Sequence, residues 1–549
     1  MKKLIAILCG AALIFGFGVS LSGCSGSDEG SQDNMKGADN VNDSGFPIVK
    51  NPIKMSLFAP GTGMQEWSKM STNEEYTKMT GISWDFTTPP LTDVSTKLNL
   101  AIASGDYPDV LFGLGTDNLK NASLVKYAEQ GILLPLDNLI DKYAPNLKAA
   151  LEKYPDVKKS ITAPDGHIYS LPSLTEPQPS SIWPRGPLWY NGDWLKKLGV
   201  TEDTLPKTTD EFYELLKKFK TQNLSGNNDD IPITDTDMNS IRPWLMSAFG
   251  ILAQDAFVDN GKVVYGPTDP RYKDYLLFMN KLYKENLLDH DVYQQQDEQK
   301  KAKGNANRLG VFSDWFPYFT TGKSENASLD YYMFKPLTSS DSPAAVAPMS
   351  QGFTMNAFSI TKHCQNPPAA MRWVDYFYSE EGYNFVDSGP EGDLYKWETN
   401  DKGEKVRVYA KADVTPDNAE DQRGKLSPCY GIVCPALAAY LPGVKTEAQK
   451  NDPLYSPFQN FIKDQTELAL KPYGKVAFPM TYLTSEESEQ ITDLSNDLQT
   501  AVQSWEGKFI TGKEDINAKW DAYVNTINSI GIDQYVKVYQ EAYDRYQKD

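Results

Sequence analysis

Apolar residues in the first part of the chain switch between strand-like runs and helical spacing. Short apolar runs at 53–58, 82–87 and 110–112 lie next to Gly or Pro turns and predict strands, of which 110–112 has the character of a buried parallel strand. Residues 64–79 and 92–103 between them place apolar side chains at helical spacing. This alternation predicts an α/β lobe whose ligand meets loops at the carboxyl ends of the strands.

The remaining pattern extends this mixture of elements without a repeat of solenoid period. Thr208 or Thr209 begins a helix that runs to Phe219. Further strands are predicted at 168–171, 309–312 and 353–360, and further helices at 276–283, 369–378, 491–505 and 516–546. The long proline-rich stretch at 172–187 suits a crossing between two lobes.

Lys2 and Lys3 precede an apolar run from Leu4 to Val19, which is too short for a permanent membrane span. Residues 1–23 are therefore predicted to be a signal peptide. Leu21-Ser22-Gly23-Cys24 resembles a bacterial lipobox, which implies a diacylglyceryl group on Cys24. Two acyl chains give a durable membrane anchor where one gives marginal binding. The alternative is an ordinary secretory signal in which Cys24 is incidental.

Residues 24–45 are mostly Gly, Ser, Asn and Asp, with few apolar residues. Such a segment buries too little apolar surface to offset the entropy of ordering. We therefore expect 24–45 to be a lipidated, flexible tether that holds the protein at the extracytoplasmic face of the bacterial cell membrane.

Composition narrows the partners of the folded part. The 549 residues are 40% hydrophobic and carry a formal net charge of −19, which argues against nucleic-acid and anionic-lipid surfaces as partners.

After the signal peptide and lipidated Cys24, only Cys364, Cys429 and Cys434 remain as thiols. Cys429 and Cys434 either close a small loop or stay free. With 3 histidines and no Cys or His pair at ligand spacing, zinc is not expected.

Several segments resemble one protein family in the same order along the chain. Residues 97–106, KLNLAIASGD, followed by Pro108 and Asp109, resemble the first-lobe signature of extracellular solute-binding proteins of family 1, the receptors of carbohydrate ABC importers. Later matches are PDGHIYSLP at 164–172, LWYNGDWLKKLG at 188–199, LPKTTDEF at 205–212, FITG at 509–512 and WDAY at 520–523. Together they are similar to the branch that binds alginate and complex oligosaccharides.

The resemblance implies a two-lobed α/β fold of the periplasmic-binding-protein type II, with a cleft and hinge between the lobes. Residues 46–180 and 350–390 would form lobe 1, and 181–349 and 391–549 would form lobe 2, with crossings near 172–187, 344–350 and 388–395. The implied function is a monomeric, lipid-anchored receptor that binds an oligosaccharide and delivers it to the permease subunits of an ABC importer. No catalytic activity and no required cofactor are implied.

Two other classes of function stay open. A secreted surface glycoside hydrolase needs two carboxylates spaced across a glycosidic bond, and acids adjacent in sequence, such as Asp229 with Asp230, do not establish that spacing. The chain also lacks a Gly-x-Ser-x-Gly elbow, a His-Glu-x-x-His helix and a Walker loop. A sensor or adhesin lipoprotein that binds another polar solute is the second alternative.

Sugar sites combine aromatic walls with a few polar groups, and 12% of this chain is aromatic. Side chains in crossings or just after strands are better candidates than those on helical faces, where core packing is the default. The predicted ligand-binding residues are Trp183, Arg242, Trp244, Trp315, Phe353 and Glu391. Glu391 lies in Gly389-Pro390-Glu391-Gly392, which resembles the family's Gly-x-Glu-Gly crossing.

A polar loop before Ile231 resembles the calcium loop of alginate-binding relatives. Its candidate ligands are Asn223, Ser225, Asn227, Asp229 and Asp230. Thr221 stands where those relatives place the opening acid, and calcium affinity depends on the number of carboxylates. The sequence leaves two alternatives, a weak structural calcium site and a polar turn that binds nothing.

Overall fold

The computed structural model describes residues 34–175, 182–183, 186–415, 418–438, 443–451 and 457–548. The predicted signal peptide and the lipidation site at Cys24 lie outside these residues. Within these ranges, no helix has both the length and the apolar character required to cross a membrane.

The last part of the predicted tether, residues 34–45, is folded onto the protein, so the tether prediction is wrong there. The side-chain amide of Asn34 donates to the Pro135 carbonyl at 2.6 Å, and Val41 is buried and bridges to Val49. The guanidinium of Arg372 donates to carbonyls of this segment. A few buried side chains and backbone hydrogen bonds are enough to order a polar segment.

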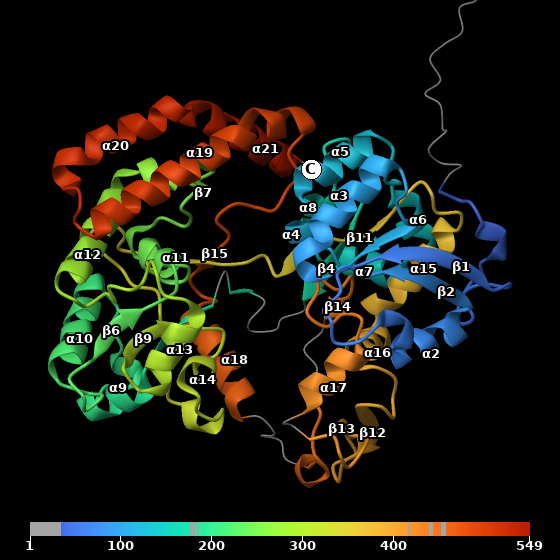
Figure 1. Ribbon diagram of the computed structural model, residues 1–549, viewed down its shortest axis with the longest axis horizontal. Helices are drawn as coiled ribbons and strands as arrows, with labels where there is room; N and C mark the ends of the chain where they lie inside the picture. Colours follow the sequence, from blue (N-terminus) through green and yellow to red (C-terminus); the bar gives the residue numbers. More distant parts are fainter. Residues whose placement is uncertain are drawn as a thin grey trace, which may run out of the picture.

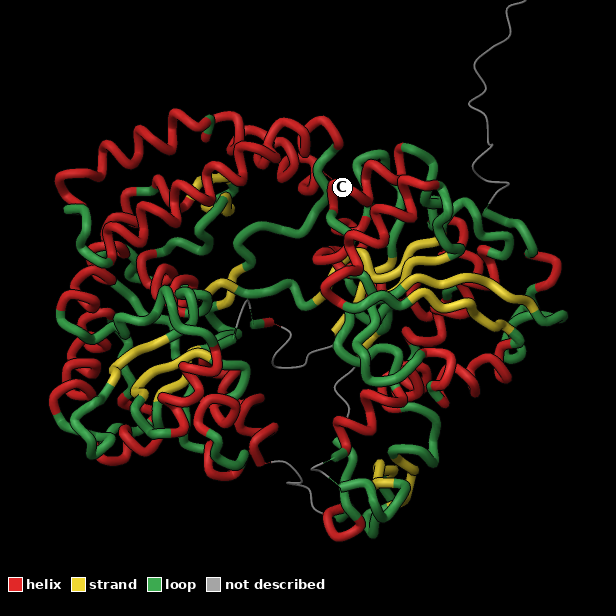
Figure 2. The backbone as a smooth tube through the Cα atoms, viewed as in Figure 1, coloured by secondary structure: helices red, strands yellow, loops and turns green. Residues whose placement is uncertain are grey.

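One half of the molecule is built on a six-stranded sheet with the order β14-β4-β11-β3-β1-β2. Its strands are β1 Ile53–Phe58, β2 Ile82–Thr87, β3 Val110–Phe112, β4 Leu171–Thr175, β11 Phe353–Ile360 and β14 Leu437–Ala438. β1 pairs in parallel with β2 and β3, whereas β11 is antiparallel to β3 and β4. Figure 2 shows strands of this sheet side by side in the right half of the molecule.

Helices surround this sheet on the right of Figure 1. They are α2 Ser71–Thr80, α3 Val94–Ser104, α4 Gly115–Asn118, α5 Asn121–Glu129, α6 Asp137–Tyr143, α7 Pro145–Lys153, α8 Pro155–Ile161, α15 Pro367–Asp375, α16 Glu380–Ser388 and α17 Ala419–Leu426. Except for α4 and α17, the apolar faces of these helices and the sheet enclose one continuous core. The apolar residues of α17, Ala419 and Leu426, pack instead against a separate small cluster.

The other half contains a three-stranded sheet, order β5-β9-β6, and a second continuous core. Its strands are β5 Leu188–Tyr190, β6 Ile231–Thr234 and β9 Leu309–Ser313, with the hairpin β7 Ala256–Asp259 and β8 Lys262–Tyr265. Its helices are α9 Gly192–Leu198, α10 Thr209–Thr221, α11 Ile241–Met246, α12 Pro270–Lys284, α13 Asp297–Asn305, α14 Pro317–Thr321, α18 Pro457–Ala469, α19 Ser485–Ile510, α20 Ile516–Ile530 and α21 Ile532–Lys548. The last three lie together along the top of Figure 1.

The chain passes between the two cores near β10 Ala347–Pro348 and near β15 Gly474–Lys475. These two short strands pair with each other. Ala347 belongs to the second core and Phe353 to the first, so the chain passes from one core to the other within 347–353. Tyr482 follows β15 yet is buried in the first core, where its hydroxyl donates to Asn356 at 2.6 Å.

The segment after residue 390 differs from the prediction that 391–549 belongs to the second lobe. The hairpin β12 Tyr395–Thr399 and β13 Lys405–Tyr409 has a small core of its own, and β14 joins the larger sheet beside β4. Among the described residues after 390, Phe458 is the first that belongs to the second core. The chain therefore does not cross at 388–395, because the long-range pairing of β14 keeps the segment with the first half.

Candidate functional site

The carboxyl ends of two parallel strands meet in the smaller sheet. Ile233 of β6 pairs with Val311 of β9, and Thr234 pairs with Phe312. The next residues along the two strands, Asp235 and Ser313, are both buried. In α/β sheets this edge is where ligands are bound.

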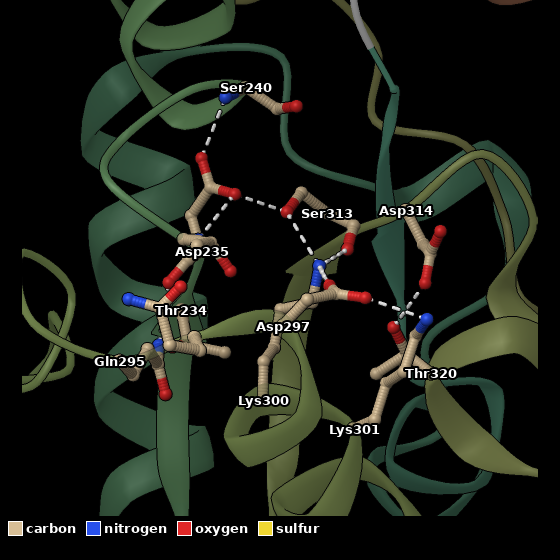
Figure 3. Close-up of polar contacts among 12 residues, drawn as sticks. Thr234, Asp235, Ser240, Gln295, Asp297, Lys300, Lys301, Ser313, Asp314 and Thr320 are labelled. Carbon is tan, nitrogen blue, oxygen red and sulfur yellow. Dashed lines mark hydrogen bonds and ion pairs between the residues drawn. The ribbon is translucent and has the colours of Figure 1, made fainter. Parts of the chain in front are cut away.

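A buried polar network fixes this edge (Figure 3). The Ser313 hydroxyl donates to one Asp235 carboxylate oxygen, and the other oxygen accepts the backbone amides of Ser240 and Ile241 at 2.7 and 2.9 Å. Lys300 of α13 is only 4% exposed, and its ammonium donates to the Ser313 carbonyl at 2.7 Å. Buried charges of this kind are stable only when they are paired and hydrogen-bonded.

The network continues toward solvent through α13. Asp297 accepts from Lys300 at 3.0 Å and from Lys301 at 2.6 Å. Burial works to raise the pKa of Asp297, but the hydrogen bonds from the two lysines hold that pKa below its ordinary value. Asp314, which directly follows β9, accepts from the Thr320 hydroxyl at 2.7 Å. Asp314 and Asp297 are thus two carboxylates near the end of this strand.

An aromatic platform adjoins this polar edge. The rings of Trp183 and Trp315 stack at 6.2 Å between centroids with an interplanar angle of 22°. Trp183 is 3% exposed, and its indole nitrogen donates to Thr466 of α18 at 3.2 Å, whereas Trp315 is 51% exposed. Phe319 of α14 adds a second exposed ring. We call Trp183 with Trp315 the tryptophan platform; its exposed face is the kind of surface that packs on an apolar ring face.

The other predicted ligand-binding residues lie elsewhere. Trp244 is fully buried in the second core, and Arg242 is held by Glu506 of α19 in an ion pair at 2.8 Å. Phe353 is buried in the first core on β11. Glu391 is exposed and accepts the Trp397 amide at 3.0 Å beside the β12-β13 hairpin. Trp244 and Phe353 thus have no free ring face, because core side chains surround them.

Lys300, Ser313 and Asp235 are the site residues that the sequence did not reveal. Lys300 belongs to a run with Lys301 and Lys303, and such runs ordinarily form a solvated face. The one available signal was the position of Asp235, an acid directly after an apolar strand.

The two acids of the predicted calcium loop already have partners within the protein. Asp230 accepts the backbone amides of Leu224 and Ser225, while Asp229 forms an ion pair with the guanidinium of Arg308 at 2.6 Å. Calcium requires six to eight oxygen ligands. Here the two carboxylates are committed to backbone amides and to a cation of the protein itself.

Comparison with known proteins places this arrangement in a family. The model of the family described as "Bacterial extracellular solute-binding protein" matches residues 61–384, which is more than half of the chain. The chain belongs to this family. Its α/β fold is therefore the two-lobed type II fold that the sequence predicted, and we call the half with the larger sheet the first lobe and the other half the second lobe.

Two relatives and their structures are similar over most of the chain. The fructooligosaccharide ABC transporter substrate-binding protein FusA of Streptococcus pneumoniae is 27% identical over 490 residues, or 86% of each chain. Its structure in complex with kestose has a TM-score of 0.70 at 26% identity and covers 90% of this chain and 100% of its own. An extracellular solute-binding protein from Bifidobacterium longum subsp. infantis has a TM-score of 0.73 at 21% identity, covering 90% of this chain and 98% of its own. The family and these relatives are binding proteins.

Proposed function

We propose that this protein is a lipid-anchored extracytoplasmic receptor that binds an oligosaccharide between its lobes and delivers it to an ABC importer. The observation that carries the proposal is the tryptophan platform beside a buried polar network at the carboxyl ends of β6 and β9. A half-exposed indole provides a flat apolar wall, and the neighbouring Asp297 and Lys301 provide hydrogen-bonding groups for sugar hydroxyls.

A relative's ligand and the charge of this chain guide the choice of sugars to test. FusA is named for fructooligosaccharides and is described in complex with kestose. We therefore take kestose and longer fructans as the first probes. The acidic chain disfavours highly anionic ligands such as nucleic acid. Transport itself comes from permease subunits, and the receptor acts as a monomer without a required cofactor.

Isothermal titration of the purified protein with kestose, maltotriose and an oligogalacturonide tests the proposal. Binding of at least one sugar is expected, and the sugar should remain intact when the mixture is afterwards followed by chromatography. Cleavage of the sugar would favour a hydrolase instead. Absence of binding to all neutral and acidic oligosaccharides in a wider panel would favour a sensor or adhesin for another solute.

The anchor has a separate test. We expect fatty-acid labelling of the wild-type protein in cells and release of a Cys24→Ala variant from the membrane, because two acyl chains give stable attachment. A wild-type protein that carries no acyl group would contradict the anchor and leave sugar binding untouched.

A further inference from the structure

A disulfide closes a small loop in the first lobe. Cys429 and Cys434 are joined, and the loop between them contains Tyr430, Gly431, Ile432 and Val433. We call residues 429–434 the disulfide loop. The three side chains other than glycine are half-buried, and the loop carries no charged residue.

The first lobe holds this loop at both of its ends. Before the loop, the Ser427 hydroxyl donates to the Val386 carbonyl at 2.7 Å and accepts the Cys429 amide at 3.1 Å. After the loop, the Leu174 amide of β4 donates to the Ala436 carbonyl at 2.9 Å, and β14 then pairs with β4. The disulfide thus closes a span whose two ends are already fixed.

The loop lies against the carboxyl ends of the parallel strands. Gly113 directly follows β3, and a Cβ atom there would come within 2.4 Å of the Ile432 Cδ1 atom. At Gly115 a Cβ atom would come within 2.6 Å of a Val433 methyl group. Both glycines also have positive φ, a conformation that side chains disfavour. Glycine therefore both permits this backbone and leaves space for the loop.

This position matches that of the tryptophan platform in the other lobe, because both lie where ligands meet the ends of parallel strands. Ala438 of β14 pairs with Thr175, the last residue of β4. Trp183 follows Thr175 by 8 residues, so the chain limits their separation to roughly 27 Å. Figure 1 places β4, β14 and α4 on the side of the first lobe that faces the second.

We propose that the disulfide loop forms the first lobe's wall of the oligosaccharide site and that its disulfide holds this wall ready for the ligand. This inference rests on the proposed function. Ile432 and Val433 pack against Gly113 and Gly115 and so seat the loop on the strand ends. The Tyr430 ring, with the Arg423 guanidinium carbon 4.8 Å from its centroid, adds an aromatic and polar surface to the loop. Without the disulfide, the loop has to be ordered when the ligand binds, and that ordering weakens affinity.

The test compares wild-type protein with a Cys429→Ser, Cys434→Ser double variant by titration with kestose and the other sugars named above. We expect affinity to fall by about five- to tenfold in the double variant, because an ordering cost is added to binding. Dithiothreitol should cause the same loss in the wild type and none in the double variant. In that reaction its two thiols become a cyclic disulfide, and the protein disulfide takes up the two electrons and two protons.

A second variant keeps the disulfide intact and so remains informative if the double variant folds poorly. Ile432→Ala should also weaken sugar binding, whereas Leu100→Ala, which truncates a 60% exposed leucine on α3, should not. If wild type binds the sugar but the loop variants bind it equally well, the inference is wrong and the proposed function stands. If wild type binds no oligosaccharide, both are wrong.

Discussion

The carboxyl ends of β6 and β9 are neighbours in one sheet, yet the tryptophans that follow them have opposite environments. Trp244, after β6, is 0% exposed and packs edge-on against Phe334 with 6.0 Å between ring centroids. Trp315, after β9, is 51% exposed, and its ring stacks on that of Trp183.

The element after each strand explains the difference. After β6, the Asp235 carboxylate accepts two amides at the start of α11, and that helix carries Trp244 into the second core. After β9 no helix begins until Pro317, so Trp315 lies in the intervening loop. A strand end brings a side chain to the ligand edge of a sheet, but the next element decides whether its ring stays accessible.

The largest expected effect is that of Trp244→Ala on stability. Removing a fully buried indole should lower the free energy of unfolding by about 3 to 5 kcal/mol, because a cavity remains in the core. Chemical denaturation followed by circular dichroism measures it, with Trp315→Ala as the matched control that should change stability far less. If both variants lost the same free energy of unfolding, Trp244 and Trp315 would not differ in burial as described.

Arg242→Met should cost about 3 kcal/mol of unfolding free energy, because it leaves a buried carboxylate without its cation. Glu506 is 1% exposed and also accepts from the Tyr272 hydroxyl at 2.9 Å. Adding Glu506→Met should recover most of the loss, since replacing both members of a buried ion pair by apolar residues is often neutral. A double variant as unstable as the single one would show that packing of Arg242 dominates.

Local patterns predicted much of the first lobe. The strands at 53–58, 82–87 and 110–112 are confirmed as β1, β2 and β3, because short apolar runs between turns leave few alternatives. The helix predicted at 516–546 is instead two helices, α20 and α21, separated at Gly531, whose φ is 122°. A glycine inside a periodic pattern was too weak a signal to locate that break.

Local sequence patterns could not predict features that depend on partners far away in the chain. The two residues of β14 carry no strand pattern of their own, and their pairing with β4 joins residues far apart in the sequence. Lys300 has the sequence context of a surface lysine, but the Ser313 carbonyl provides a buried partner. The tryptophan platform was predictable in part, since Trp315 follows a clear strand.

Trp315→Ala should weaken sugar binding about fivefold, because loss of one stacking contact costs about 1 kcal/mol. Its melting temperature should stay close to that of wild type, as half of the ring is already in water. Titration with the sugar that binds wild type measures the effect, and Trp315→Phe should retain part of the affinity. Unchanged affinity in the alanine variant would place the ligand away from the platform.

The smallest expected effect is that of calcium. Thr221, which replaces the opening acid, donates its hydroxyl to the Lys217 carbonyl at 2.8 Å and so faces its own helix. The Lys220 ammonium donates to the Asp230 carbonyl at 3.2 Å, which places a second protein cation beside the loop in addition to Arg308. We therefore expect neither chelator nor added calcium to shift the melting temperature by more than about 1 °C, since a loop whose carboxylates already have protein partners gains little from a cation.

Arg308→Met shows whether the guanidinium takes the place of the metal. The ion pair with Asp229 is about one third exposed on both sides, and such pairs contribute only about 0 to 1 kcal/mol. The variant should therefore unfold at a slightly lower temperature, and calcium should now recover part of the difference, because Asp229 is released. Magnesium is the control, since it requires closer octahedral geometry. A large loss of stability on chelation of the wild type, recovered by calcium but not by magnesium, would mean that the loop rearranges to bind the metal despite Arg308.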